Sequence, residues 1–191
     1  DLKSIRFKID PKKLSLFLET ENPNINYLNL TIPVQNLKVY VDVLSLIKTN
    51  PKINKINLTL EELDIIQLNK FSSIIKPSNF KSFLNNKIKE GKLVSEIEIF
   101  LDEKGFFKDF IAKGKVKNLH AELFNNFNLT KTNLSFFADK NDILIKSING
   151  KFEDINISDG DVKLNLENGM TINSNFNSNL KFNKNLLKKY E

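Results

Sequence analysis

Apolar and polar residues alternate over most of the chain, which is the pattern of half-buried β-strands. The clearest case is 172–183, where the even positions are Ile, Ser, Phe, Ser, Leu and Phe and the odd positions are all Asn or Lys. A helix would spread those polar residues around its circumference, whereas a strand places them on one solvated face. The pattern therefore predicts a chain built mainly of amphipathic strands.

From about Gly91 to Phe182 the alternation is nearly unbroken and predicts an antiparallel meander of long strands. Turn residues are expected to separate these strands at 102–105, 139–142, 159–160 and 168–169. The segment 159–161 is interpreted as part of a hairpin turn rather than a calcium loop, because the loop's terminal Glu is absent. A bulge after Ile145 would carry one strand on through Ile148.

The N-terminal third also alternates and predicts strands at 5–9, 14–18, 27–32, 37–41 and 56–60. Pro11, Pro23, Pro33 and Pro51 are expected between these strands, where the missing N–H does no harm. A short turn of helix is expected at 43–48.

Between the two strand-rich regions the period changes to that of a helix. Residues at i, i+3, i+4 and i+8 spacing predict two short helices at about 64–75 and 78–89, with Asp64 and Ser78 as N-caps and Gly91 as a stop. We expect one domain over 1–191, which is itself a fragment of a longer protein. Its parts are N-terminal strands at 1–63, a helical insertion at 64–89, the meander at 90–183 and a tail at 184–191.

Ten or more amphipathic strands present far more apolar surface than two short helices can cover. At about 25 cal/mol per Å2, leaving such a face in water would forfeit tens of kcal/mol. The sheet can fold onto itself as a sandwich, close as a barrel, or curl around an apolar ligand. Strands that run to about ten residues or more exceed the usual sandwich length of about 5–6 residues, so they favour a meander curled into an open groove or half-barrel.

Composition and charge narrow the function. The chain has 191 residues, 40% of them hydrophobic, and a net charge of +6. Nearly all its basic residues are scattered lysines rather than clustered arginines, so we expect no nucleic acid partner. No apolar run reaches the roughly 18 residues of a membrane helix.

Residues that carry chemistry are scarce. The chain has no Cys and a single histidine, His120, which is interpreted as an ordinary surface or edge residue. Glu96 and Glu98 are expected side by side on a solvated strand face rather than as a glycosidase pair. No glycine-rich phosphate loop is present. We therefore expect no enzyme, no catalytic residue, no metal site and no cofactor.

Several segments resemble the AsmA-like family of repeating β-groove proteins, which includes YhdP and TamB. Segment 36–46, a strand and short helix, precedes an Ile-x-x-Ile-x-Leu repeat within 51–58. Segments 114–119 and 148–152 are similar to the Gly-x-Val and Ile-x-Gly-x-Phe strand openings of that group. The resemblance implies a non-enzymatic lipid-transfer segment in the cell envelope, periplasmic and anchored to the inner membrane through a segment outside this chain. It also implies that phospholipid moves along an apolar groove toward the outer membrane.

On this interpretation the partners are phospholipid or another acyl-chain lipid, with membranes contacted through parts outside the chain. Acyl chains would lie on residues of the meander that share one side of the strands. These residues are Ile97, Ile99, Leu101, Phe110, Leu134, Phe136, Ile143, Ile145, Val162, Leu164, Phe176 and Leu180. Two alternatives stay open: a structural or adhesive β-sandwich module, and a scaffold that assists outer-membrane protein assembly by edge-strand pairing.

Overall fold

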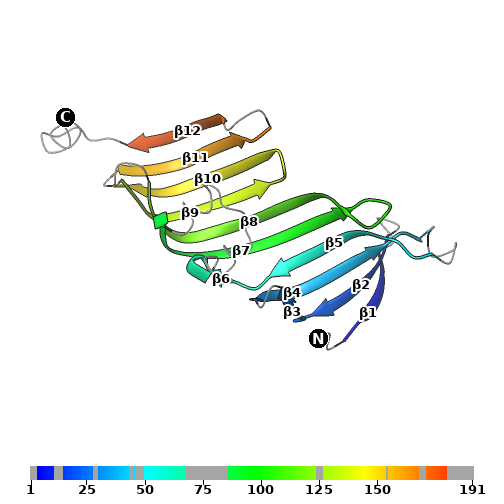
Figure 1. Cartoon of the computed structure of the whole chain (residues 1–191). Coiled ribbons are helices and arrows are strands. Elements are labelled where there is room, and N and C mark those ends of the chain that lie inside the picture. Colours follow the sequence, from blue (N-terminus) through cyan, green and yellow to red (C-terminus); the bar gives the residue numbers. More distant parts are fainter. Residues whose placement is uncertain are drawn as a thin grey trace, which may run out of the picture.

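The computed structural model describes residues 4–10, 15–27, 30–43, 45, 50–67, 86–123, 127–153, 155–167 and 171–179. Twelve antiparallel strands in these residues form one open, unclosed sheet, so the prediction of a mainly β chain is confirmed. The strands lie side by side almost in sequence order, from β1 at one edge to β12 at the other (Figure 1).

The first half of the sheet consists of β1 (Arg6–Asp10), β2 (Ser15–Glu21), β3 (Asn24–Tyr27), β4 (Leu30–Val41), β5 (Ile53–Leu60) and β6 (Leu63–Asp64). The second half consists of β7 (Ile88–Leu101), β8 (Phe107–Glu122), β9 (Asn128–Ala138), β10 (Asp142–Phe152), β11 (Ile155–Asn165) and β12 (Thr171–Asn179). Each strand from β7 to β12 pairs with the next, which confirms the predicted meander. The short strands β3 and β6 lie off the main path and pair with β4 and β7.

The two predicted helices are not seen in the described residues. Where the first was expected to begin, Leu63 and Asp64 form β6, and residues Ile65–Gln67 form the short 3-10 helix η1. Where the second was expected to end, Ile88 already belongs to β7 and pairs with Ala121. Strand pairing thus replaces the helical conformation where the first helix was expected to begin and where the second was expected to end. Residues 68–85, between these two places, lie outside the described part of the chain.

Three other local predictions are corrected by the register. The expected strand at 27–32 is instead a hairpin, in which Tyr27 at the end of β3 pairs with Leu30 at the start of β4. Pro33 lies inside β4 rather than between strands. The expected turn at 159–160 is the middle of β11, and the preceding hairpin turns at Glu153 instead.

The four strands β8 to β11 each contain a residue with a positive φ near their middle, and we call this line of residues the crease. It consists of Asn118 (φ 51°), Lys131 (49°), Ser147 (53°) and Asp159 (50°). The strand register shifts next to each of them, which is the mark of a β-bulge. The bulge expected after Ile145 is therefore confirmed, and it is one of a series that crosses the sheet.

Side chains of neighbouring strands hold the crease in place. Three of its backbone N–H groups, freed from the regular ladder, donate to side-chain oxygens of an adjacent strand. The pairs are Asn118 to Asn133 (3.1 Å), Ser147 to Asp161 (3.3 Å) and Asp159 to Asn149 (3.2 Å). An unpaired backbone N–H group costs free energy when it leaves water, and these hydrogen bonds offset that cost at the bulges.

The main buried cluster lies beside the crease. Leu63 of β6 and Ile65 of η1 pack there with Leu93, Val116 and Ala121, all at most 7% exposed. Gly91 of β7 fits under this cluster, because a Cβ at that position would lie 3.3 Å from Ile65 Cγ2. The short elements β6 and η1 therefore anchor the centre of the sheet.

We predict that Ser147→Val lowers the free energy of unfolding by about 1–2 kcal/mol, because a β-branched side chain is strongly disfavoured at positive φ. Ser147→Gly should change it by less than about 1 kcal/mol. Urea denaturation measures both. Ser158→Val is the matched control, since Ser158 is exposed on β11 and does not have a positive φ. Equal losses from the two valine variants would contradict a left-handed backbone at Ser147.

Candidate functional site: the apolar face of the sheet

Strand register shows that apolar residues form continuous rows across the sheet, because directly opposed residues point to the same side. The longest row crosses eight strands from β4 to β12. It contains Leu37, Leu58, Ile97, Ala112, Ala138, Ile143, Leu164 and Ile172. We call the side of the sheet that carries this row the apolar face and the opposite side the polar face.

Neighbouring rows extend the apolar face in both directions. One begins at the first edge strand and contains Phe7, Leu18, Val39, Ile56, Ile99 and Phe110. Another contains Phe136, Ile145 and Val162, and a further one contains Leu63, Leu93, Val116 and Leu134. The apolar face thus reaches from β1 to β12 without a charged residue in these rows.

The structure brings together the residues that the sequence predicted as lipid-lining. Eleven of the twelve lie on the apolar face, with Leu101 following Ile99 and Phe176 following Ile172 by alternation along their strands. The twelfth, Leu180, lies outside the described residues. That acyl chains lie on these residues stays a prediction.

Aromatic rings cover glycines at two places on the apolar face. A Cβ at Gly114 would lie 2.8 Å from the Phe136 ring, and one at Gly160 would lie 2.4 Å from the Phe176 ring. Each ring therefore lies across the backbone of the neighbouring strand. This packing keeps the face smooth where a side chain is missing, and it makes Phe136 and Phe176 part of the sheet surface.

Exposure varies along the apolar face. Leu93 and Val116 next to the crease are buried, as are Leu16 and Val34 in the first half of the sheet, and most other residues of the rows are half-buried. At the two edges large side chains lie open to solvent: Phe7 is 61% exposed on β1, and Ile172 is 57% exposed on β12. Burying such a side chain contributes about 1.5–3 kcal/mol, so the edges keep unused apolar surface.

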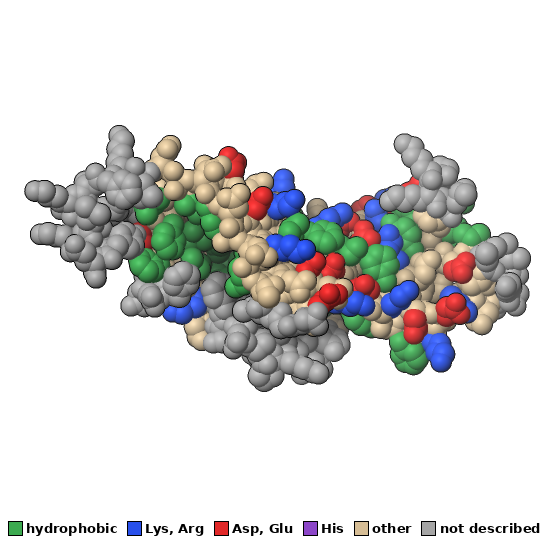
Figure 2. All heavy atoms as spheres, turned by 90° about the horizontal axis from the view of Figure 1, so that it is seen from above, with side chains coloured by type: hydrophobic (Ala, Val, Ile, Leu, Met, Phe, Trp, Pro, Cys, Tyr) green, Lys and Arg blue, Asp and Glu red, His purple; other side chains and the backbone are tan. Residues whose placement is uncertain are grey.

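Ion pairs and rings organise the polar face. Lys55 bonds Glu98 at 3.4 Å and lies 4.2 Å from the centroid of the Tyr40 ring, which packs on Phe17. Glu96 accepts a 2.6 Å hydrogen bond from Asn57 and pairs with Lys113 at 3.0 Å. Figure 2 shows charged side chains of both signs over the middle of the molecule and a gathering of hydrophobic side chains toward its left end.

The hydrogen bonds and charges of this face lower the pKa of two of its carboxyl groups. Glu19 pairs with Lys8, and this contact outweighs burial and holds the pKa of Glu19 below its ordinary value, assisted by Asn36 and Lys38. The hydrogen bond from Asn57, together with Lys113, lowers the pKa of Glu96. Glu96 and Glu98 thus lie on the polar face, as predicted, and Glu96 is held as a structural anion.

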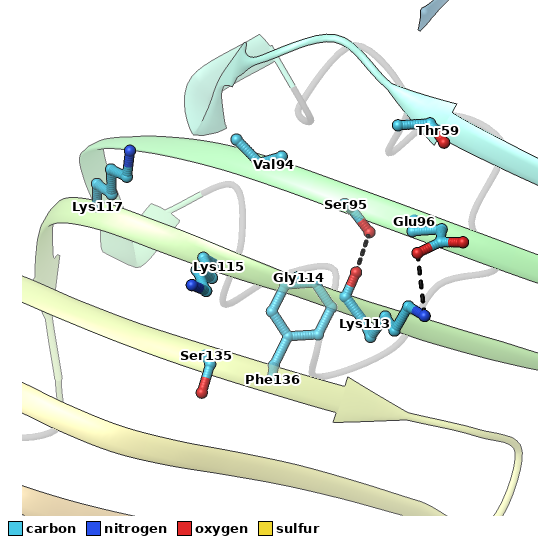
Figure 3. Close-up of a pocket in the computed structure, with 10 residues that line it drawn as sticks. All are labelled: Thr59, Val94, Ser95, Glu96, Lys113, Gly114, Lys115, Lys117, Ser135 and Phe136. Carbon is cyan, nitrogen blue, oxygen red and sulfur yellow. Dashed lines mark hydrogen bonds and ion pairs between the residues drawn. The ribbon is translucent and has the colours of Figure 1, made fainter. Parts of the chain in front are cut away.

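An open hollow of about 570 Å3 lies over β7, β8 and β9 (Figure 3). Its lining is mostly from the polar face, with the Phe136 ring lying beside Gly114. The lining residues are Thr59, Val94, Ser95, Glu96, Lys113, Gly114, Lys115, Lys117, Ser135 and Phe136. The aliphatic stems of the lysines and several small side chains surround this hollow.

Metal-binding clusters are not found in this part of the molecule: no group of three or more His, Asp or Glu among the described residues could hold an ion. His120 lies in β8, where the strand register places it opposite Glu90 of β7. Within the described ranges, no helix has the length and apolar character needed to cross a bilayer. Comparison with protein families, curated proteins and solved structures finds no match for the chain.

Sequence reasoning missed two parts of the site. The predicted lining set began at Ile97, yet β1, β2, β4 and β5 also carry the apolar face. The crease was also missed, apart from one bulge. Its signal is a break in alternation inside each long strand, followed two residues later by Asn or Asp, as at Asn133, Asn149 and Asp161.

We predict that Glu19→Gln lowers the free energy of unfolding at pH 7 by about 1–3 kcal/mol, because hydrogen bonds to a buried ionised carboxylate are lost. The lowered pKa of Glu19 means that its stabilisation is complete above the ordinary carboxyl pKa and is lost as the pH falls through the lower folded-state value. The difference between variant and parent should therefore shrink below about pH 4. Urea denaturation across pH 3–7 tests this.

Glu21→Gln serves as the control, because the pair between Glu21 and Arg6 is more than half exposed and should contribute little. If the two variants lose the same stability, or if the Glu19 difference persists unchanged at pH 3, the assignment of Glu19 as a buried anion is wrong.

Proposed function

We propose that the chain is a non-enzymatic lipid-binding and lipid-transfer segment that holds acyl chains on its apolar face. One observation supports this above the others. Overlapping apolar rows together extend from β1 to β12 of a single open sheet, and most of their residues are half-buried. A sheet with this much apolar surface and few covering elements is suited to an extended apolar ligand.

The energetics fit a long chain better than a compact ligand. Each buried methylene contributes about 0.8 kcal/mol, so an acyl chain gains affinity in proportion to the length that lies on the rows. Contacts of this kind have no preferred direction. Because no charged group interrupts the rows, a chain can slide from one strand to the next, which transfer between membranes requires.

The proposed setting follows the resemblance to the AsmA-like proteins. In that setting the chain would be periplasmic and joined to the inner membrane through another part of the polypeptide, with phospholipid as its cargo. The alternative of a structural sandwich module has less support, since the described strands form one sheet rather than two stacked ones.

A second candidate, a scaffold that pairs with strands of other proteins, is favoured by one feature. All nine residues of β12 are exposed, and the strand contains neither charge nor proline. Such an edge lacks the usual protection against strand addition.

Uptake of a fluorescent fatty acid, with native mass spectrometry of the gently extracted protein, tests lipid binding. We predict that Ile145→Thr reduces uptake about tenfold, because it places a hydroxyl in the middle of an apolar row. Leu144→Thr is the matched control. It makes a comparable change one residue away on the polar face, where Leu144 pairs with Phe137 and Lys163, and should leave uptake within about twofold.

Circular dichroism confirms that both variants are folded before they are compared. Absence of any co-purified lipid and of any uptake by the parent protein would refute the proposal. An equal loss in the two variants would place binding elsewhere than on the apolar face. If Ile145→Thr spares the activity of the protein and a proline in β12 abolishes it, the scaffold is supported instead.

A further inference from the structure

The polar face carries lysines that lack an acidic partner. Lys115 and Lys117 of β8 and Lys146 of β10 are exposed and form no ion pair with the described residues. Six of the other ten lysines in the described strands are paired, as Lys92 is with Glu62 at 2.8 Å and Lys163 with Asp142 at 3.3 Å. Lys115, Lys117 and Lys146 differ from the remaining four because they lie near one another on the polar face.

Strand register places these lysines close together. Lys115 lies opposite Ser135 of β9, and Ser135 lies opposite Lys146 of β10, so the two lysines flank one serine in a single row. With strands about 4.8 Å apart, their Cα atoms are roughly 10 Å from each other. Lys117 lies one position further along the same face of β8, opposite Lys92. At this separation, about one Debye length at physiological salt, the lysines repel one another only weakly, and they can act together on an anionic surface.

The hollow over β7 to β9 lies at the same place. Lys113, Lys115 and Lys117 all line it, with Ser135 at its side (Figure 3). Lys113 is turned to Glu96, and the two are joined by an ion pair, so its charge is compensated. Lys115 and Lys117 form no ion pair with the described residues. Lys92 is the main cause of the lowered pKa of Glu62, and the positive charge of Lys117 adds a smaller contribution.

Apolar side chains project beside these lysines. Val94 lies opposite Lys115, and Phe137 lies opposite Lys113; each is 39% exposed. Exposed apolar groups among unpaired lysines are typical of surfaces that contact a bilayer, since the lysines meet anionic headgroups and the apolar groups enter the boundary below them. We call Val94, Lys115, Lys117, Phe137 and Lys146 the lysine patch.

We propose that the lysine patch docks the polar face onto the surface of an anionic lipid bilayer. A bilayer is favoured over a nucleic acid because the patch contains only lysines, which act as point charges, and none of the arginines whose planar fork recognises phosphates and bases. Docking through this side leaves the apolar face free. The inference does not depend on acyl-chain binding, because it rests on different residues on the opposite side of the sheet.

Vesicle flotation with the whole chain tests the proposal. The protein should float with vesicles of phosphatidylcholine containing 30% phosphatidylglycerol, and not with pure phosphatidylcholine vesicles. Each lysine near such a surface contributes about fivefold in affinity, so Lys115→Gln with Lys146→Gln should weaken binding roughly 20-fold. Binding should also disappear in high salt.

Lys104→Gln with Lys108→Gln is the matched control. It removes the same net charge from exposed positions at the β7–β8 hairpin and should weaken binding less than about threefold. Equal losses in the two double variants would overturn the patch, because net charge alone would then explain binding. Equal flotation with neutral vesicles, or binding of duplex DNA or RNA with no flotation, would overturn it as well.

The two proposals fail separately. Ile145→Thr should keep vesicle docking while losing fatty-acid uptake, and the lysine double variant should do the reverse. Loss of both properties in both variants would refute the separation of the two faces.

Discussion

The apolar face depends on one constraint: the residues that form its rows must stay on the same side of each strand from one end of the strand to the other. A strand that bends through a bulge contains an extra residue, and an extra residue in ordinary extended geometry would turn all later side chains to the wrong face. The left-handed residues of the crease absorb that extra position. On β10, Ile145 before Ser147 and Ile148 after it therefore both face the apolar side. Without this geometry the residues beyond the crease, such as Ile148, would face the polar side.

Much of this could be predicted from the sequence. Period-two alternation identified the strands from β7 to β12 and assigned Ile97, Phe136 and Val162 to one side. This was possible because successive side chains of a strand point to opposite faces, so the sequence itself shows which residues share a face. The expected length of the strands favoured an open sheet over a sandwich, and the sheet is open and unclosed.

The rest depended on contacts between residues distant in sequence. The helix expected to end at Lys89 is replaced there by strand, because the partner of Ile88 is Ala121, more than thirty residues away. Asp159 and Gly160 have the composition of a turn, yet Asn149 supports Asp159 and the Phe176 ring covers Gly160, so the strand continues through them. Local propensity contains no information on partners that are distant in the sequence, and the local predictions at these positions were wrong for that reason.

The order of the strands has a consequence for how the chain reaches this state. From β7 onward each strand lies next to its neighbour in sequence, joined by a short connection, so every new ladder closes only a small loop. The entropy lost at each step stays low, and pairing can advance one hairpin at a time in the manner of a zipper. This half of the sheet, from β7 to β12, therefore assembles without pairing between strands that are far apart in the sequence, which slows the folding of many β proteins.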